Sequence, residues 1–211
     1  MKLFGTIWFY ILAIGVAGYA VFAYGFMPLG SLVHPDMKIN FLAHKMGIYT
    51  HVFASLVALS LSPFQFSSRL RSTRHKLHRI IGRTYLGVGV ALGGLSGLYM
   101  SAFAFGGYVA KLGFACLAVC WLFTGLRAFQ SIRMGAVQEH RKWVVRNVSL
   151  TLAAVTLRIY LPSSMIAGIP FELAYPVIAW LCWVPNLLVA ELAFAGTYNK
   201  SFKPKSLRGS A

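Results

Sequence analysis

Six long apolar stretches do most to limit what this chain can fold into. A helix needs roughly 20 apolar residues to cross the ~30 Å hydrocarbon layer of a bilayer. Segments of that length lie at about 3–26, 43–66, 80–105, 108–130, 143–161 and 173–195. Their continuous apolar character, without a period of two, favours helices over the strands of a barrel. The sequence therefore predicts an all-α polytopic membrane bundle of six transmembrane helices, forming one integral membrane domain over residues 1–211.

The positions of the positive charges predict the orientation of this bundle. The chain has 20 Lys and Arg, and with a cytoplasmic N-terminus all but four of them lie on the cytoplasmic side. The four exceptions are Lys38, Lys45, Lys111 and Arg158. Cytoplasmic loops of membrane proteins carry an excess of Lys and Arg, so both termini are predicted to be cytoplasmic.

The formal net charge of +16 has the same origin and does not indicate a nucleic-acid-binding protein. The basic residues lie in short loops next to the predicted spans, where anionic lipid headgroups attract them. The partner that the charge predicts is therefore the lipid bilayer with its anionic headgroups, and nucleic acid is excluded.

Three of the predicted spans carry polar or small residues on one face. Residues three or four apart lie on the same side of a helix, and polar groups in membrane helices turn away from lipid. In the second span these residues are His44, Gly47, His51 and Ser55, and in the fifth they are His140, Asn147, Thr151 and Arg158. The third span carries Gly89, Gly93, Gly97 and Ser101, a face suited either to close helix packing or to a flat cofactor. These three spans are predicted to surround a partly polar interior.

Two charged residues within the spans have two interpretations each. For Arg158 the acidic residues on the same side are Glu172 and Asp36, and for Glu191 the basic residues at similar depth are Arg83, Arg127 and Arg146. Such residues form structural ion pairs, or they mark a path for a substrate or protons. Both interpretations remain open from the sequence.

Two histidines at matching depth lead to a hypothesis about a cofactor. His78-Arg79 and His140-Arg141 open the third and fifth spans on the cytoplasmic side, and each pair is followed by a further arginine, Arg83 or Arg146. Such a pair of imidazoles can ligate one heme b iron, with the arginines binding its propionates. The alternative is that these basic residues are interfacial contacts to lipid. His44 and His51 have no histidine partner on the fourth or sixth span, so no second heme is predicted.

Several segments resemble a known family of bacterial membrane proteins. They are His78-Arg79-Ile80-Ile81-Gly82-Arg83-Thr84-Tyr85, Gly93-Gly94-Leu95-Ser96-Gly97, Glu139-His140-Arg141-Lys142-Trp143-Val144-Val145-Arg146, and the stretch from Thr151 to Arg158. Together they are similar to the multi-pass family called domain of unknown function 2306, over about His44 to Pro162. The resemblance implies the bacterial cytoplasmic (inner) membrane. It also implies that the histidines and arginines of these segments act together as a site or core.

The leading functional hypothesis is a membrane electron carrier that binds heme b or quinone between the second, third and fifth spans. His78 and His140 would be the axial ligands, with Arg79, Arg83, Arg141 and Arg146 binding anionic groups. His44 and His51, with the buried polar residues Asn147, Arg158 and Glu191, would line the interior. The alternatives are a small-molecule or lipid transporter built around Arg158 and Glu191, and an accessory subunit of a larger membrane complex. Whether the chain is an enzyme stays open from the sequence, which favours a protein that is not; as a redox protein it would be a membrane electron carrier or an oxidoreductase subunit.

Overall fold

The computed structural model describes residues 3–201, and over this range the chain is helical with no strand. The long helices in chain order are α1 (Leu3–Val21), α3 (Lys45–Leu61), α7 (Gly107–Arg133), α8 (Val137–Thr151), α9 (Ala153–Ile166), α10 (Phe171–Leu181) and α11 (Val184–Ser201). Shorter ones are α2 (Pro35–Ala43), α4 (Ser68–Thr73), α5 (His75–Thr84) and α6 (Gly93–Ser101). Three further turns are η1 (Phe22–Phe26), η2 (Pro63–Phe66) and η3 (Tyr85–Leu92), of which η1 and η3 are π-helical.

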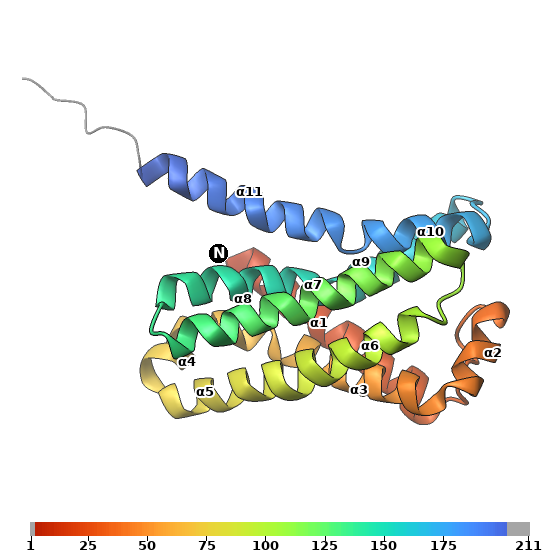
Figure 1. The fold of residues 1–211 in the computed structure, drawn as a ribbon, viewed down its shortest axis with the longest axis horizontal. Helices are drawn as coiled ribbons and strands as arrows, with labels where there is room; N and C mark the ends of the chain where they lie inside the picture. Colours follow the sequence, from red (N-terminus) through yellow and green to blue (C-terminus); the bar gives the residue numbers. More distant parts are fainter. Residues whose placement is uncertain (1–2, 202–211) are drawn as a thin grey trace, which may run out of the picture.

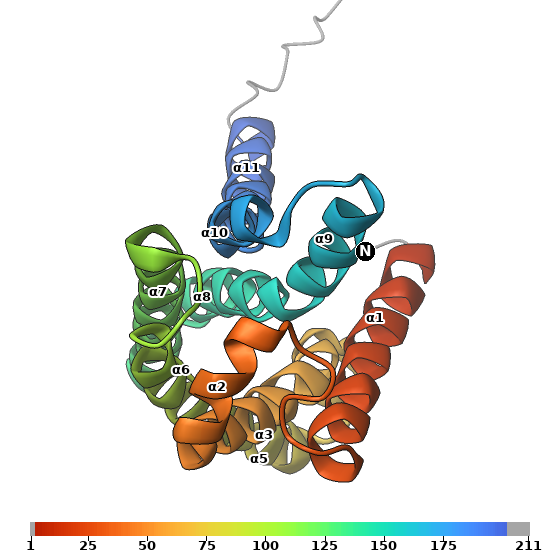
Figure 2. The ribbon, with the colours of Figure 1, turned by 90° about the vertical axis from the view of Figure 1, so that its right-hand side faces the viewer.

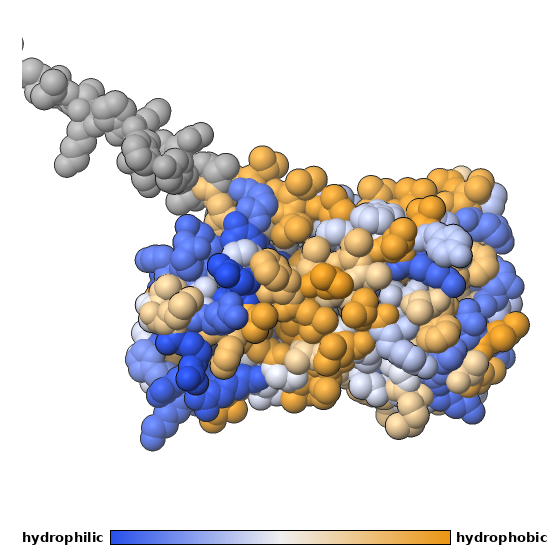
Figure 3. All heavy atoms as spheres, viewed as in Figure 1, coloured by the Kyte–Doolittle hydropathy of each residue, from blue (hydrophilic) through white to orange (hydrophobic). Residues whose placement is uncertain are grey.

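The long helices run along one common axis, so the bundle has two distinct ends (Figure 1). We call the end that carries α4, the start of α5 and the α7–α8 connection the basic end. Helix α1 begins and α11 ends toward it. The opposite end carries α2 and the α9–α10 connection. Hydrophobic side chains form a belt between two hydrophilic ends (Figure 3), which is the surface expected of a protein that spans a membrane.

Five helical segments are long and apolar enough to cross a membrane. They are Gly5–Phe26, Lys45–Phe66, Gly107–Arg133, Val137–Ile166 and Phe171–Phe194, and they match five of the six predicted spans within a few residues. The third predicted span, 80–105, corresponds to the continuous α5–η3–α6 helix from His75 to Ser101. This helix is not among the five, because its many glycines and Arg83 make it less apolar.

The glycine face of that helix packs directly against α3. A Cβ atom added at Gly89 would lie 2.8–2.9 Å from the Cβ, Cα and backbone nitrogen of Ala58, and one at Gly97 would lie 2.8 Å from the His51 ring. Only glycine allows two helices to approach this closely. Of the two interpretations of this face, close helix packing is therefore the one found in the structure.

A buried hydrogen-bond network joins η3, α7 and α8 at the centre of the bundle. The Asn147 side chain accepts a hydrogen bond from Tyr85 Oη at 2.6 Å and donates to Trp121 O and Thr124 Oγ1 at 2.7 and 2.8 Å. Thr151 Oγ1 accepts from Trp121 Nε1 at 2.9 Å. Asn147 is fully buried and its amide is satisfied on both sides, so it acts as a structural residue of the core.

The last predicted span is interrupted where α10 ends and α11 begins. Pro185 follows Val184, the first residue of α11, and the chain turns at Cys182 and Trp183. The carbonyl oxygen of Cys182 accepts hydrogen bonds from Thr156 Oγ1 at 2.8 Å and Asn186 Nδ2 at 3.0 Å. Neighbouring polar side chains therefore satisfy the backbone at the break, as an interruption within a membrane-spanning segment requires.

Because α3 approaches η3 closely at Gly89 but not at Gly87, alanine substitutions at these two glycines should differ in their effect on stability. Gly89→Ala places a methyl group on the Ala58 backbone and should lower the free energy of unfolding by about 1–3 kcal/mol. Gly87→Ala is the matched control, because nothing lies within 4 Å of its added Cβ. Unfolding in mixed detergent micelles measures both. Equal stability of the two variants would contradict the packing described here.

Candidate functional site

A cavity of about 280 Å³ lies inside the bundle toward the opposite end. Residues of α1, α3, α6, α7, α8, α9 and α10 line it, as do Met37 and Phe41 of α2. Helix α2 lies across this end of the bundle (Figure 2). Its volume is close to the lower end of the roughly 300–1,000 Å³ found for ligand pockets. Most of the lining side chains are apolar, and a few polar groups converge among them. These polar groups decide what the cavity is able to bind.

Arg158 of α9 supplies the positive charge of the cavity. Its Nη1 donates a hydrogen bond to Ala154 O at 2.9 Å, and its guanidinium lies 5.5 Å from the centre of the Tyr19 ring. The Nε atom is buried and has no hydrogen-bond partner in the described part of the chain. Within those residues Arg158 also forms no salt bridge. Its guanidinium therefore has a hydrogen-bond donor left for a ligand.

The sequence offered Asp36 and Glu172 as ion-pair partners of Arg158, but neither of them pairs with it. The carboxylates of both lie together with the imidazole of His34 at the opposite end. The reason is that Asp36 is in the first turn of α2 and Glu172 is in the first turn of α10, and these two helix starts meet away from Arg158.

His51 and Ser55 of α3 line the same cavity. His51 Nδ1 lies 2.9 Å from Gly93 O, and since a carbonyl oxygen only accepts hydrogen bonds, Nδ1 carries the proton. In the neutral ring this leaves Nε2 as a hydrogen-bond acceptor. The Ser55 hydroxyl is buried without a hydrogen-bond partner among the described residues. Together with Arg158, these residues give the cavity two free donors and one imidazole acceptor.

His44, the other histidine predicted near this interior, does not line the cavity. It lies where α2 meets α3, with Nδ1 2.8 Å from the Tyr99 hydroxyl and its ring stacked on Phe103 at 3.6 Å. Its ring is held by these two contacts outside the cavity wall.

His78 of α5 and His140 of α8 both lie at the basic end, and neither lines the cavity. Partial burial lowers the pKa of His78, and the positive charge of nearby Arg71 lowers it further. The Nδ1 atom of His78 is buried and has no hydrogen-bond partner in the described residues. His140 Nδ1 lies 2.9 Å from Ala128 O, so it carries the proton and leaves Nε2 as an acceptor.

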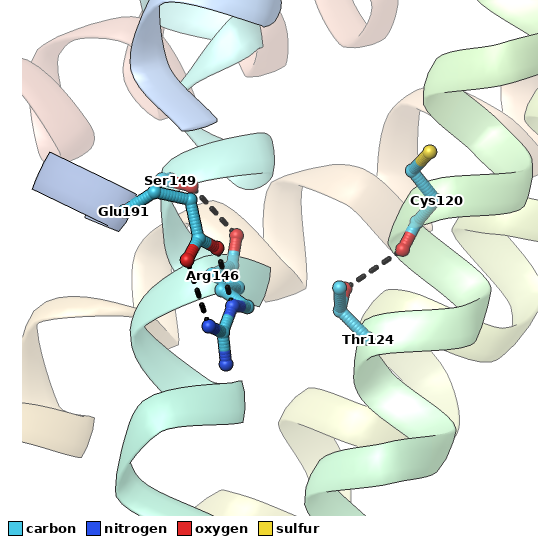
Figure 4. Close-up of polar contacts among 5 residues, drawn as sticks. All are labelled: Cys120, Thr124, Arg146, Ser149 and Glu191. Atoms are coloured by element: carbon cyan, nitrogen blue, oxygen red, sulfur yellow. Dashed lines mark hydrogen bonds and ion pairs between the residues drawn. The ribbon is translucent and has the colours of Figure 1, made fainter. Parts of the chain in front are cut away.

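The arginines that follow these histidines divide into two groups. Arg79, Arg83 and Arg141 are exposed at the basic end. Arg146 instead binds Glu191 of α11 through two parallel hydrogen bonds, one of them 2.8 Å from Nη2 to Oε2 (Figure 4). The Arg146 guanidinium also lies 4.7 Å from the centre of the Trp143 ring. Of the partners predicted for Glu191, Arg146 is the one found, and the pair links α8 to α11.

Two cavity residues were not recognised from the sequence as part of the site. Tyr24 of η1 and Trp121 of α7 both line the cavity. Neither of their spans shows a polar face of regular spacing, so no pattern pointed to them. The sequence points to Trp121 only indirectly, through Gly93. A Cβ atom added at Gly93 would lie 3.1–3.2 Å from the Trp121 ring, so glycine at this position leaves room for the ring.

The comparisons with known proteins agree with the resemblance found in the sequence. A family model described as "Predicted membrane protein (DUF2306)" matches residues 48–194, which is more than half of the chain. The match extends beyond Pro162 through α10 and most of α11. No curated protein and no solved structure matches the chain. The comparisons therefore support a multi-pass membrane protein and identify no ligand.

The Arg146–Glu191 pair can be measured with a double-mutant cycle. Because the two hydrogen bonds are parallel and Arg146 is partly buried, Arg146→Gln with Glu191→Gln should give a coupling energy of about 1 kcal/mol in the free energy of unfolding. The exposed pair of Glu139 and Lys142 is the control, for which we expect a smaller coupling because water screens both charges. A coupling no larger than the control would show that the pair does not hold α11 to α8.

Proposed function

We propose that this chain, which belongs to the predicted membrane protein family DUF2306, binds a quinone inside its helical bundle and takes part in electron transfer. The single observation that carries the proposal is the apolar cavity with unpaired polar atoms of Arg158 and Ser55 and with His51, whose Nε2 is left as an acceptor. The protein spans the bacterial cytoplasmic membrane six times, with both termini in the cytoplasm.

The six-span topology is supported by the α5–η3–α6 helix, which has the length to cross the bilayer although it is less apolar than the other five. The positions of the charges support the orientation. Most Lys and Arg are at the basic end, toward which α1 begins and α11 ends. A basic end in the cytoplasm agrees with the bias seen in membrane proteins generally.

The chemistry of a quinone matches the groups in the cavity. Its ring and isoprenoid tail are apolar and suit the apolar wall. Its two carbonyl oxygens accept hydrogen bonds, and Arg158 Nε–H and the Ser55 hydroxyl are donors without partners among the described residues. Reduction by two electrons and two protons turns each carbonyl into a hydroxyl, which becomes a donor. His51 Nε2 then accepts from a quinol hydroxyl, so the site has a partner for both redox states.

A buried donor without a partner that forms a hydrogen bond to a ligand contributes strongly to binding. The donors of Arg158 and Ser55 should therefore contribute much of the affinity for a quinone. Arg158→Gln and Ser55→Ala should each weaken binding of a short-chain quinone about tenfold, which is about 1.4 kcal/mol. Quenching of tryptophan fluorescence reports binding, because Trp121 lines the cavity. Lys45→Gln, an exposed cation at the same end, is the control. If both cavity variants bind the quinone as the wild type does, the proposed site is wrong.

A heme b at the basic end is the second part of the proposed redox function. The imidazoles of His78 and His140 are chemically suitable to hold the iron of such a heme. Burial favours the neutral imidazole of His78, and the hydrogen bond to Ala128 O leaves His140 Nε2 free to coordinate. Arg79, Arg83 and Arg141 are exposed around them and able to bind propionates, whereas Arg146 is occupied by Glu191. A bound heme would supply one-electron transfer at this end.

The heme is tested by absorption of the purified protein, oxidised and reduced with dithionite. A Soret band with sharpened α-bands on reduction is expected in the wild type. It should be lost in the His78→Ala/His140→Ala variant and retained in His75→Ala, which removes an exposed histidine of the same helix. A wild type that shows no Soret band after expression with added heme would rule out the heme and leave the quinone cavity unaffected.

Transport or handling of an anionic lipid is the alternative that one observation favours. Arg158 is a buried cation with no salt bridge among the described residues, and a fatty-acid carboxylate would neutralise it. The same fluorescence titration separates the two functions. Binding of a fatty acid that is lost in Arg158→Gln, with no binding of the quinone, would replace the redox function by lipid transport.

A further inference from the structure

Three metal-ligating side chains from distant parts of the chain meet at the opposite end of the bundle. They are His34, Asp36 and Glu172, and their ligand atoms all lie within 4.8 Å of one another. His34 and Asp36 are at the start of α2, and Glu172 is in the first turn of α10. Asp36 and Glu172 are two of only four acidic residues in a chain of net charge +16, so their proximity is not explained by abundance.

The imidazole of His34 stacks on an aromatic ring and has its Nδ1 near the Asp36 carboxylate. Its ring stacks on Phe171, with the centres 4.0 Å apart and the planes 5° from parallel. Nδ1 lies 3.5 Å from Asp36 Oδ2. That nitrogen is buried and makes no hydrogen bond within the described residues. An imidazole nitrogen beside two carboxylate oxygens is a donor set that a divalent transition-metal ion binds.

We propose that His34, Asp36 and Glu172 bind one divalent transition-metal ion such as Zn²⁺. One nitrogen and two oxygen ligands suit zinc, and three protein ligands leave a coordination position for water. The imidazole disfavours Mg²⁺ and Ca²⁺, which prefer oxygen ligands. The proposal goes beyond the proposed function and does not depend on it, because none of the three residues lines the cavity.

The ion would connect α2 to α10 next to the cavity. Met37, which follows Asp36, and Phe41 of α2 both line the cavity. On the other side, Phe171 packs on Tyr175, which also lines it, with ring centres 5.1 Å apart. A metal bridge between the starts of α2 and α10 would therefore hold α2 in its place over the cavity.

Calorimetric titration of the purified protein with ZnCl₂ tests the site, after removal of any affinity tag and treatment with EDTA. We expect one Zn²⁺ per chain, with Mg²⁺ and Ca²⁺ binding at least tenfold more weakly. His34→Gln and Glu172→Gln should each weaken Zn²⁺ binding at least tenfold. His75→Gln and Glu139→Gln are the controls, since they remove an exposed histidine and an exposed acid at the basic end.

Thermal unfolding separates loss of the site from loss of the fold. In EDTA, Glu172→Gln should unfold at the same temperature as the wild type, and Zn²⁺ should raise the unfolding temperature of the wild type alone. No stoichiometric Zn²⁺ binding to the wild type would overturn the proposal. Equal binding in His34→Gln and Glu172→Gln would overturn it as well, because the ion would then be bound elsewhere.

Discussion

The close approach of α3 to the η3–α6 helix is the interaction on which the rest of the structure depends. It requires glycine at positions 89 and 97, where any side chain would collide with Ala58 or the His51 ring. The same approach brings His51 Nδ1 to the backbone oxygen of Gly93, which fixes the proton on that nitrogen and leaves Nε2 as an acceptor. Packing and chemistry are therefore set by the same residues, because the glycines that allow the contact also orient the imidazole that lines the cavity.

The polar groups inside the bundle serve two different purposes, and their hydrogen bonds distinguish them. Asn147 and the residues around it satisfy one another completely, so they stabilise the contact of η3, α7 and α8 and have no capacity left for a ligand. Arg158 and Ser55 keep unpaired atoms, and both line the cavity. An unpaired buried polar group is costly in a membrane protein, where intramembrane ionisable residues are usually functional. The cavity is thus the part of the interior where a bound ligand would contribute most to stability, because it would pair these groups.

Much of the fold was predictable from the sequence, whereas the pairing of side chains was not. Length and hydropathy located the spans, because crossing the bilayer imposes a minimum length, and regular spacing located the polar faces of 44–55 and 140–158. The same spacing did not distinguish satisfied Asn147 from unsatisfied Arg158, since that depends on Tyr85, Trp121 and Thr124 of other helices. The proximity of His34 and Glu172 was also not predictable from the sequence. It depends on where α2 and α10 begin in space, and most of the chain separates these two helices.

Occupation of the bundle interior by a quinone can be measured on protein purified from bacterial membranes in mild detergent. The bound organic molecules are extracted and the quinone per chain is quantified by chromatography and mass spectrometry, for the wild type and for His51→Leu. We expect close to one quinone per chain in the wild type and much less in the variant, when equal amounts of folded protein are compared. A wild type with no more quinone than an unrelated membrane protein prepared in the same way would contradict it.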